Sequence, residues 1–236
     1  MIGGFIITGN TPKKVVLRGL GPSLARFGIT DFLADPFLEL HGSSGALIRK
    51  NDNWKDDQRP EIEGTVFQPS DDRESVIVAT LVPGAYTALL TGKGGTTGVG
   101  TVEIYDANLA ADSELANIST RGFVQTGDNV LIAGTIVLGQ TSQKVMVRAI
   151  GPSLTVPGKL ADPTLELRDS NGALLEANDN WVDSPNKQAI IDSTIPPTNN
   201  LESAIVRTLT PASYTAIVRG AGGTTGVAVV EVYALQ

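Results

Sequence analysis

The heptapeptide Arg18-Gly-Leu-Gly-Pro-Ser-Leu24 occurs a second time as Arg148-Ala-Ile-Gly-Pro-Ser-Leu154. Two further segments recur in the same order: Asn51-Asp-Asn-Trp54 as Asn178-Asp-Asn-Trp181, and Gly94-Gly-Thr-Thr-Gly-Val99 as Gly222-Gly-Thr-Thr-Gly-Val227. The paired segments start 130, 127 and 128 positions apart, so the copies differ only by short changes in loop length. The chain is therefore an internal duplication. A functional group present in one copy alone cannot serve an activity that both copies share.

Composition excludes several classes of function. The 236-residue chain carries a net charge of −7, which argues against nucleic acid or an anionic membrane surface as a partner. It contains no cysteine, so it can form no disulfide, thiolate nucleophile or zinc–thiolate site. No apolar run approaches the roughly 18 residues of a transmembrane helix, and we expect no insertion into a membrane.

Apolar residues occur in short β-branched runs separated by turn residues, and helical spacing is almost absent. In the first copy this pattern predicts strands at residues 2–8, 14–20, 36–41, 46–50, 75–82, 85–91 and 99–105. In the second copy it predicts strands at residues 130–138, 144–150, 163–168, 173–177, 203–209, 213–219 and 227–233. Short strands with glycine-containing turns favour an all-β fold of two tandem antiparallel β-sandwich, jelly-roll-like domains.

We expect the first sandwich at residues 1–106, a linker at 107–120 and the second sandwich at 121–236. Residues 121–125, the turn Thr126-Gly-Asp-Asn129 and the strand from Val130 together predict a β-hairpin. This leading strand would cover an edge of the second sandwich that stays open at strand 2–8 of the first. Open strand edges pair with other chains, so the predicted partners are other repeats of a longer array or other chains.

Three more recurring motifs are Leu33-Ala-Asp-Pro-Phe-Leu-Glu-Leu40, Pro83-Gly-Ala-Tyr-Thr-Ala88 and Val102-Glu-Ile-Tyr105. As a set, the motifs resemble a module that recurs in very large secreted and surface proteins of environmental bacteria, over nearly the whole chain. The second copy departs from the pattern at Ala212-Ser213. More distantly, each copy is similar to the bacterial pre-peptidase C-terminal domain, a jelly-roll accessory module. The resemblance implies an extracellular accessory region and no established activity.

Catalysis is not expected. His41 is the only histidine, and Arg168 stands at the equivalent position of the second copy, so a repeated Ser-His-Asp arrangement is excluded. The repeated glutamates alternate with apolar strand residues and should point away from the core; they are Glu39, Glu103, Glu166 and Glu231. Arg18 and Arg148 also interrupt apolar strands, and we expect them to form cross-strand ion pairs with these glutamates.

The repeated Asn-Asp-Asn-Trp loop is the best candidate metal site, because Ca²⁺ prefers the oxygen ligands that it concentrates. The candidate ligands are Asn51, Asp52, Asn53 and Asp56 in the first copy, and Asn178, Asp179, Asn180 and Asp183 in the second. Further carboxylates recur at loop edges and could complete the shell: Asp35, Asp162, Glu74 and Glu202. The spacing is not that of an EF-hand, and Asn and Asp also form Asx-turns without metal. Both interpretations stay open.

Trp54 and Trp181, the only tryptophans, follow these polar triplets and are the candidate ligand-binding residues. An exposed ring would stack on a sugar, whereas a buried ring would cover one end of the sandwich. Tyr86 and Tyr214 follow proline-containing turns, as in the tyrosine corner of other sandwiches.

The sequence thus predicts a non-catalytic structural or adhesive repeat module of a larger extracellular or cell-surface bacterial protein. The alternative from a different class is a calcium-dependent carbohydrate-binding module.

Overall fold

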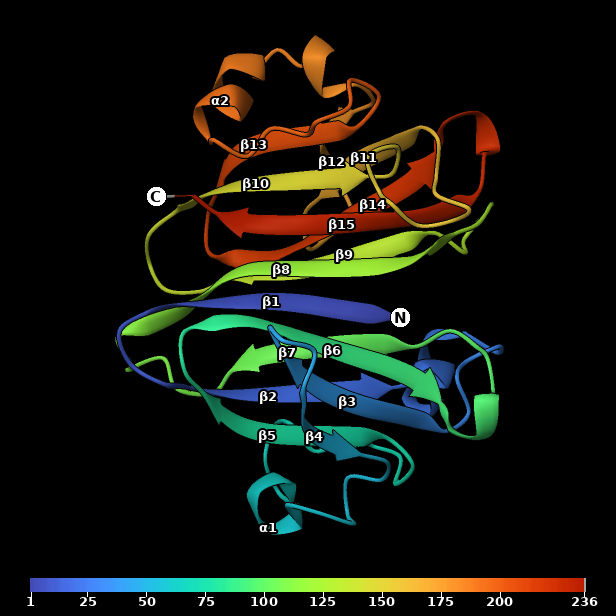
Figure 1. Ribbon diagram of the computed structural model, residues 1–236, viewed down its shortest axis with the longest axis vertical. Helices are drawn as coiled ribbons and strands as arrows, with labels where there is room; N and C mark the ends of the chain where they lie inside the picture. Colours follow the sequence, from blue (N-terminus) through green and yellow to red (C-terminus); the bar gives the residue numbers. More distant parts are fainter. Residues whose placement is uncertain (236) are drawn as a thin grey trace. The chain divides into compact units, whose positions relative to one another are not determined.

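The computed structural model describes residues 1–235 and is all-β, with antiparallel strands and a few short helical segments (Figure 1). It divides into two compact units, Met1–Ala116 (unit 1) and Asn117–Gln236 (unit 2). Each unit is an antiparallel β-sandwich, which confirms the predicted fold class. Except for the leading strand of the second copy, which begins at Ser113 rather than at residue 121, the strands begin and end within two residues of their predicted limits.

Unit 1 packs a four-stranded sheet against a three-stranded one. The order β4-β3-β6-β1 joins β1 (Ile2–Gly9), β3 (Pro36–Gly42), β4 (Leu47–Asn51) and β6 (Gly84–Gly92). The order β5-β2-β7 joins β2 (Lys13–Leu20), β5 (Ser75–Leu81) and β7 (Thr101–Asp106). The connections contain the short helical segments η1 (Pro22–Phe27), α1 (Arg59–Ile62) and η2 (Lys93–Gly95).

Unit 2 repeats this topology with one additional strand. The order β12-β11-β14-β9 joins β9 (Leu131–Val137), β11 (Pro163–Arg168), β12 (Leu174–Asn178) and β14 (Ala212–Gly220). The order β13-β10-β15-β8 joins β10 (Gln143–Ile150), β13 (Ser203–Leu209), β15 (Gly226–Ala234) and the part of β8 (Ser113–Val124) that belongs to unit 2, from Asn117 on. The connections contain η3 (Trp181–Asp183), α2 (Lys187–Asp192) and η4 (Ala221–Gly223). Apart from β8, the strand order of unit 1 is the strand order of unit 2.

In each unit one central strand, β2 in unit 1 and β10 in unit 2, is buried on both faces. In β2, Val15 and Leu17 face the sandwich core, and Val16 faces a second cluster that contains Trp54 and Ile62. Unit 2 repeats this with Met146 of β10 and Ile190 of α2 in its second cluster. A strand covered on both faces needs continuous apolar sequence rather than alternation, which explains the β-branched runs at these positions.

One prediction about strand pairing was wrong. Residues 121–125 do not form a hairpin with the strand that follows the turn: β8 pairs with β15, from Gly226 opposite Val124 to Tyr233 opposite Asn117, whereas β9 pairs with β14. The turn at 126–129 therefore carries the chain from one sheet to the other. The reason is burial: Val124 and Leu131, which flank the turn, both enter the unit 2 core, and they do so from opposite sheets. The segment 107–120, expected as a linker, includes the first residues of β8.

The glycine of the repeated Gly-Pro-Ser turn is required by a close backbone approach. A Cβ atom built at Gly151 would lie 2.4 Å from the carbonyl oxygen of Leu160, and one at Gly21 would lie 1.9 Å from the carbonyl oxygen of Leu33. Real Cβ atoms do not approach oxygen this closely. The turn and the segment ahead of the next strand are therefore packed backbone against backbone.

Gly151→Ala is expected to lower the free energy of unfolding of unit 2 by about 1–3 kcal/mol, the usual cost of forcing a methyl group into occupied space. Gly134→Ala in β9 is the control, because its Cβ would meet nothing closer than 4.0 Å. The control should be neutral or slightly stabilising. Urea unfolding monitored by Trp181 fluorescence in a Trp54→Phe background measures both variants. Equal stabilities would contradict the close approach.

Candidate functional site

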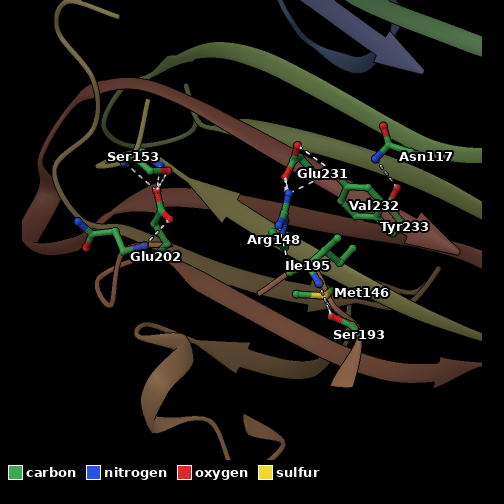
Figure 2. Close-up of polar contacts among 12 residues, drawn as sticks. Asn117, Met146, Arg148, Ser153, Ser193, Ile195, Glu202, Glu231, Val232 and Tyr233 are labelled. Carbon is green, nitrogen blue, oxygen red and sulfur yellow. Dashed lines mark hydrogen bonds and ion pairs between the residues drawn. The ribbon is translucent and has the colours of Figure 1, made fainter. Parts of the chain in front are cut away.

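A buried glutamate just ahead of the first residue of β5 or β13 holds the Gly-Pro-Ser turn in each unit. In unit 2, Glu202 accepts hydrogen bonds from the backbone N–H groups of Gly151 (3.2 Å) and Ser153 (2.9 Å) and from the Ser153 hydroxyl (Figure 2). In unit 1, Glu74 accepts the equivalent bonds from Gly21 (3.1 Å) and Ser23 (2.8 Å). Both glutamates are fully buried. A buried carboxylate needs such donors, and the N–H groups of an irregular turn need an acceptor.

The serine that follows this glutamate, Ser75 or Ser203, contacts two more segments of the chain. The Ser75 hydroxyl lies within hydrogen-bond distance of the carbonyl oxygens of Pro36, at the start of β3, and Asp52. Ser203 makes the equivalent contacts with Pro163 and Asp179. The Glu-Ser pair thus joins the Gly-Pro-Ser turn, the Asp-Pro strand start and the Asn-Asp-Asn-Trp loop at one end of each sandwich.

The first asparagine of the Asn-Asp-Asn-Trp loop is committed to the backbone. Asn51 accepts from the N–H of Val76 (2.9 Å) and donates to the carbonyl of Asn53 (3.0 Å). Asn178 repeats both bonds, at 2.9 Å and 3.1 Å, with Ala204 and Asn180. The bonds with the Asn53 and Asn180 carbonyls are local, whereas those with Val76 and Ala204 join residues 25 and 26 positions apart. In an Asx-turn the side-chain oxygen accepts from the backbone N–H two residues on, so the Asx-turn interpretation remains a prediction. In unit 1 the amide of Asn53 also donates to Asp56 at 2.8 Å.

The tryptophans belong to the packing of the loop. The backbone N–H groups of Trp54 and Trp181 donate to the carbonyls of Glu74 and Glu202, both at 2.8 Å. The Trp54 ring is 1% exposed, so the prediction that Trp54 binds a ligand was wrong: a ring this buried cannot stack on a sugar. Trp181 is partly buried against the Met146 cluster, and its indole N–H donates to the carbonyl of Asn199 at 3.1 Å. Its side chain therefore has an internal role as well.

The aspartate at the second position of the Asn-Asp-Asn-Trp loop, Asp52 or Asp179, has different neighbours in the two units. In unit 1, Asp52 forms an ion pair with Lys93 of η2, and this contact raises the pKa of the Lys93 ammonium. In unit 2, Ala221 of η4 stands where Lys93 stands in unit 1. Partial burial and the negative charge of Asp179 raise the pKa of Asp162. One oxygen of the Asp162 carboxylate is buried without a hydrogen-bond partner.

Unit 2 thus holds a carboxylate pair without the cation that unit 1 supplies from its own chain. Within residues 1–235, no group of three or more His, Asp and Glu side chains is placed to hold a metal ion. The calcium site proposed from the sequence, including Asp183 and the other loop ligands, remains a prediction.

Two of the four strand glutamates, Glu103 and Glu231, form the predicted cross-strand ion pairs with Arg18 and Arg148. Arg18 of β2 lies opposite Glu103 of β7, with 3.2 Å between Nε and Oε2. Arg148 of β10 lies opposite Glu231 of β15 and donates to it from two guanidinium nitrogens, and Tyr233 contacts both side chains (Figure 2). Burial and the neighbouring Glu231 carboxylate raise the pKa of Tyr233.

The single histidine has the contacts of its arginine counterpart. His41 lies 3.0 Å from the carbonyl oxygen of Gly45 and 3.4 Å from the carboxylate of Glu39. Arg168 donates to the carbonyl of Gly172 (2.8 Å) and to Glu166 (2.7 and 2.9 Å). The two residues thus perform the same hairpin-closing role with different chemistry.

The predicted tyrosine corners are confirmed in both units. The Tyr86 hydroxyl donates to the carbonyl of Val82 at 2.7 Å, and that of Tyr214 donates to the carbonyl of Thr210 at 2.9 Å. Sequence reasoning missed the role of Glu74 and Glu202, which it assigned to a metal shell. The available signal was a Glu-Ser pair repeated immediately before an apolar strand.

Comparison with known proteins identifies no relative by sequence: no family model and no curated protein matches the chain. Among solved structures, a protein in the structure of Sulfolobus turreted icosahedral virus aligns at 12% identity over 99% of this chain and 88% of that chain, with a TM-score of 0.29. A protein from Eubacterium rectale, provisionally described as secreted, aligns at 8% identity over 99% and 69%, with a TM-score of 0.25. VP2 of infectious bursal disease virus aligns at 10% identity over 99% and 68%, with a TM-score of 0.23. Scores this low carry no conclusion about this chain.

None of the helices within residues 1–235 has the length and hydrophobicity that crossing a bilayer requires.

Glu202→Ala is expected to lower the free energy of unfolding of unit 2 by about 3 kcal/mol or more, because it leaves several buried donors without their charged acceptor. Glu176→Ala is the control: it removes an ion pair with Arg207 and a 3.5 Å contact with the Asn186 amide, and it should cost less than about 1 kcal/mol. Urea unfolding followed by Trp181 fluorescence compares them. Should Glu202→Ala fail to fold, Glu202→Gln keeps the side-chain volume and should show an intermediate loss. If Glu202→Ala and Glu202→Gln were both as stable as Glu176→Ala, Glu202 would not be needed to hold the Gly-Pro-Ser turn.

A pH dependence follows from the raised pKa of Asp162. The folded state binds this proton more tightly than the unfolded chain does, so the free energy of unfolding falls as pH rises from the unfolded pKa of about 3.9 through the higher folded pKa. Asp162→Asn should match wild type near pH 3 and be more stable at pH 7. Urea unfolding of both proteins between pH 3 and pH 7 measures this difference in the free energy of unfolding. Asp35→Asn in unit 1 is the control and should gain nothing at pH 7, because Asp35 faces the charge of Lys93.

Proposed function

We propose that this chain is a non-catalytic structural and adhesive repeat module of a larger extracellular or cell-surface bacterial protein. One observation carries the proposal: the residues that the two copies share are used in the same internal contacts in both units. Glu74 and Glu202 each hold the Gly-Pro-Ser turn, and Asn51 and Asn178 each hold the following strand. Repeated sequence in this chain therefore maintains a scaffold.

The groups that could perform chemistry also have structural partners. The four strand glutamates are paired: Glu103 and Glu231 with arginines across the sheet, Glu39 with His41, and Glu166 with Arg168. A general acid or base needs to reach a substrate, whereas each of these carboxylates contacts a basic side chain of its own sheet. Extracellular placement is supported by the resemblance of the repeated motifs to the module of secreted and surface proteins.

A second candidate function, calcium-dependent carbohydrate binding, is favoured by one observation in unit 2. Asp162 and Asp179 repel each other where unit 1 has the ammonium group of Lys93. A Ca²⁺ ion would relieve that repulsion with the oxygen ligands that it prefers. The burial of Trp54 weakens the carbohydrate part of this candidate.

Thermal unfolding in 5 mM CaCl₂ and in EDTA separates the two functions. A ligand that binds only the folded state raises the melting temperature by mass action. The structural module predicts the same melting temperature in both buffers and no calcium-dependent signal on a glycan array. Calcium binding predicts a higher melting temperature of unit 2 in CaCl₂, which Asp179→Asn would abolish and Asp52→Asn, its counterpart beside Lys93, would leave in place. A calcium-dependent rise in the melting temperature of unit 2, together with calcium-dependent glycan binding, would overturn the proposed function.

A further inference from the structure

The sheet that contains β2 and β7 has an open edge in unit 1, and the equivalent edge of the sheet that contains β10 and β15 is covered in unit 2. In unit 2, β15 lies between β10 and β8, so both of its edges are hydrogen-bonded (Figure 1). Its counterpart in unit 1 is β7, which has the same register against β2: Glu103 lies opposite Arg18, as Glu231 lies opposite Arg148. Across the described residues, β2 is the only strand that pairs with β7.

The open edge changes the strand itself. β15 extends over nine residues, whereas β7 extends over six. The core-facing side chains of β15 are covered, with Val230 0% and Val232 7% exposed. The equivalent residues of β7, Val102 and Ile104, are only partly buried against the unit 1 core. The unit 1 sandwich therefore lacks apolar cover over Val102 and Ile104 of β7.

The opposite edge of the same sheet is protected by the chain. At β5, the Gln58 amide donates to the carbonyl of Val78 (2.8 Å) and accepts from its N–H (3.0 Å), as a neighbouring strand would. Ile62 of α1 packs beside it, against Val76 and Val78. Exposed edges are aggregation-prone, and natural proteins usually block them in such ways. β7 has no comparable block within residues 1–235.

We propose that the β7 edge binds the linker strand of another repeat of this kind, a strand with the sequence of β8. Unit 2 shows this occupant on the equivalent edge, antiparallel and in a defined register. Transferred to unit 1, that register places Ser119 of the incoming strand opposite Glu103, and Ile118 opposite Ile104. The inference rests on the proposed scaffold function and names its partner.

The sequence of β8 suits this role in two ways. Its core-facing residues pair with the core-facing residues of β15: Ile118 lies opposite Val232, and Thr120 lies opposite Val230. On β7 they would cover Ile104 and Val102. In addition, the buried Asn117 side chain donates to the carbonyl of Val232 at 3.1 Å (Figure 2). The equivalent acceptor in unit 1 is the carbonyl of Ile104. A slip of one residue would turn the apolar side chains outward, so the register is specified.

The first test supplies the strand within the chain. A second copy of residues 113–130 is fused directly ahead of Met1, which repeats the connection between β8 and β9 in unit 2. The control carries a Gly/Ser segment of equal length. We expect at least tenfold slower hydrogen exchange of the β7 amides, and a melting temperature of unit 1 several degrees higher than in the control. Equal exchange of residues 101–106 in the two proteins would overturn the inference.

The second test supplies the strand from outside and does not depend on the fusion. A fluorescent peptide of residues 113–125 is titrated into the full chain and followed by anisotropy. We expect saturable binding that Ile118→Lys in the peptide weakens at least tenfold, since it places a charge on the core-facing side. The fusion protein, whose β7 edge is already covered, should not bind the peptide. Equal binding by the fusion protein, or no binding by the original chain, would overturn the inference.

These outcomes are separate from those that test the proposed function. Glycan binding or catalysis by a chain whose β7 edge takes up the strand would contradict the scaffold function alone. A chain without such activities whose β7 amides remain equally exposed would contradict the strand-binding inference alone.

Discussion

The architecture of each sandwich depends on one buried carboxylate. Glu74 in unit 1 and Glu202 in unit 2 accept backbone hydrogen bonds from the Gly-Pro-Ser turn, across about 50 residues of sequence. The turn lies packed against another backbone segment, so only glycine fits at its first position. Removing the carboxylate would leave buried N–H groups without acceptors, and each such group costs about 1–3 kcal/mol. The loops at this end of the sandwich can therefore be irregular in shape and still be held in one arrangement.

The duplication serves as an internal control for the role of each residue. Where the copies agree, as at Asn51 and Asn178, the contacts agree too. Where they differ, the contact shows whether a role was kept or lost. Arg168 replaces His41 and keeps its contacts with a carboxylate and a turn carbonyl, so the histidine is structural. Ala221 replaces Lys93 and loses an ion pair, which leaves Asp162 beside Asp179 with a raised pKa.

Strand edges are the second constraint on this fold. A sandwich, unlike a closed barrel, leaves edge strands whose backbone groups need partners or blocks. This chain uses a glutamine side chain at β5 and a complete strand at β15. The same strand type at β7 would link one repeat to another through backbone hydrogen bonds. Such a link needs only the register and apolar pattern that β8 carries.

The sequence by itself determined the duplication, the all-β class, the positions of every strand except β8 to within two residues, the cross-strand pairs at Arg18 and Arg148, and the tyrosine corners. These features depend on local periodicity or on neighbours whose spacing the repeat reveals. Only the tertiary structure decided that β8 joins β15 rather than β9, that Trp54 is buried, and that Glu74 and Glu202 hold a turn. A turn signal specifies that the chain reverses, but the sheet that the next strand joins depends on which side of the core buries its apolar face. Likewise, each buried glutamate lies some 50 residues from the N–H groups that donate hydrogen bonds to it. No local sequence pattern shows which distant backbone donors the fold will bring to a carboxylate.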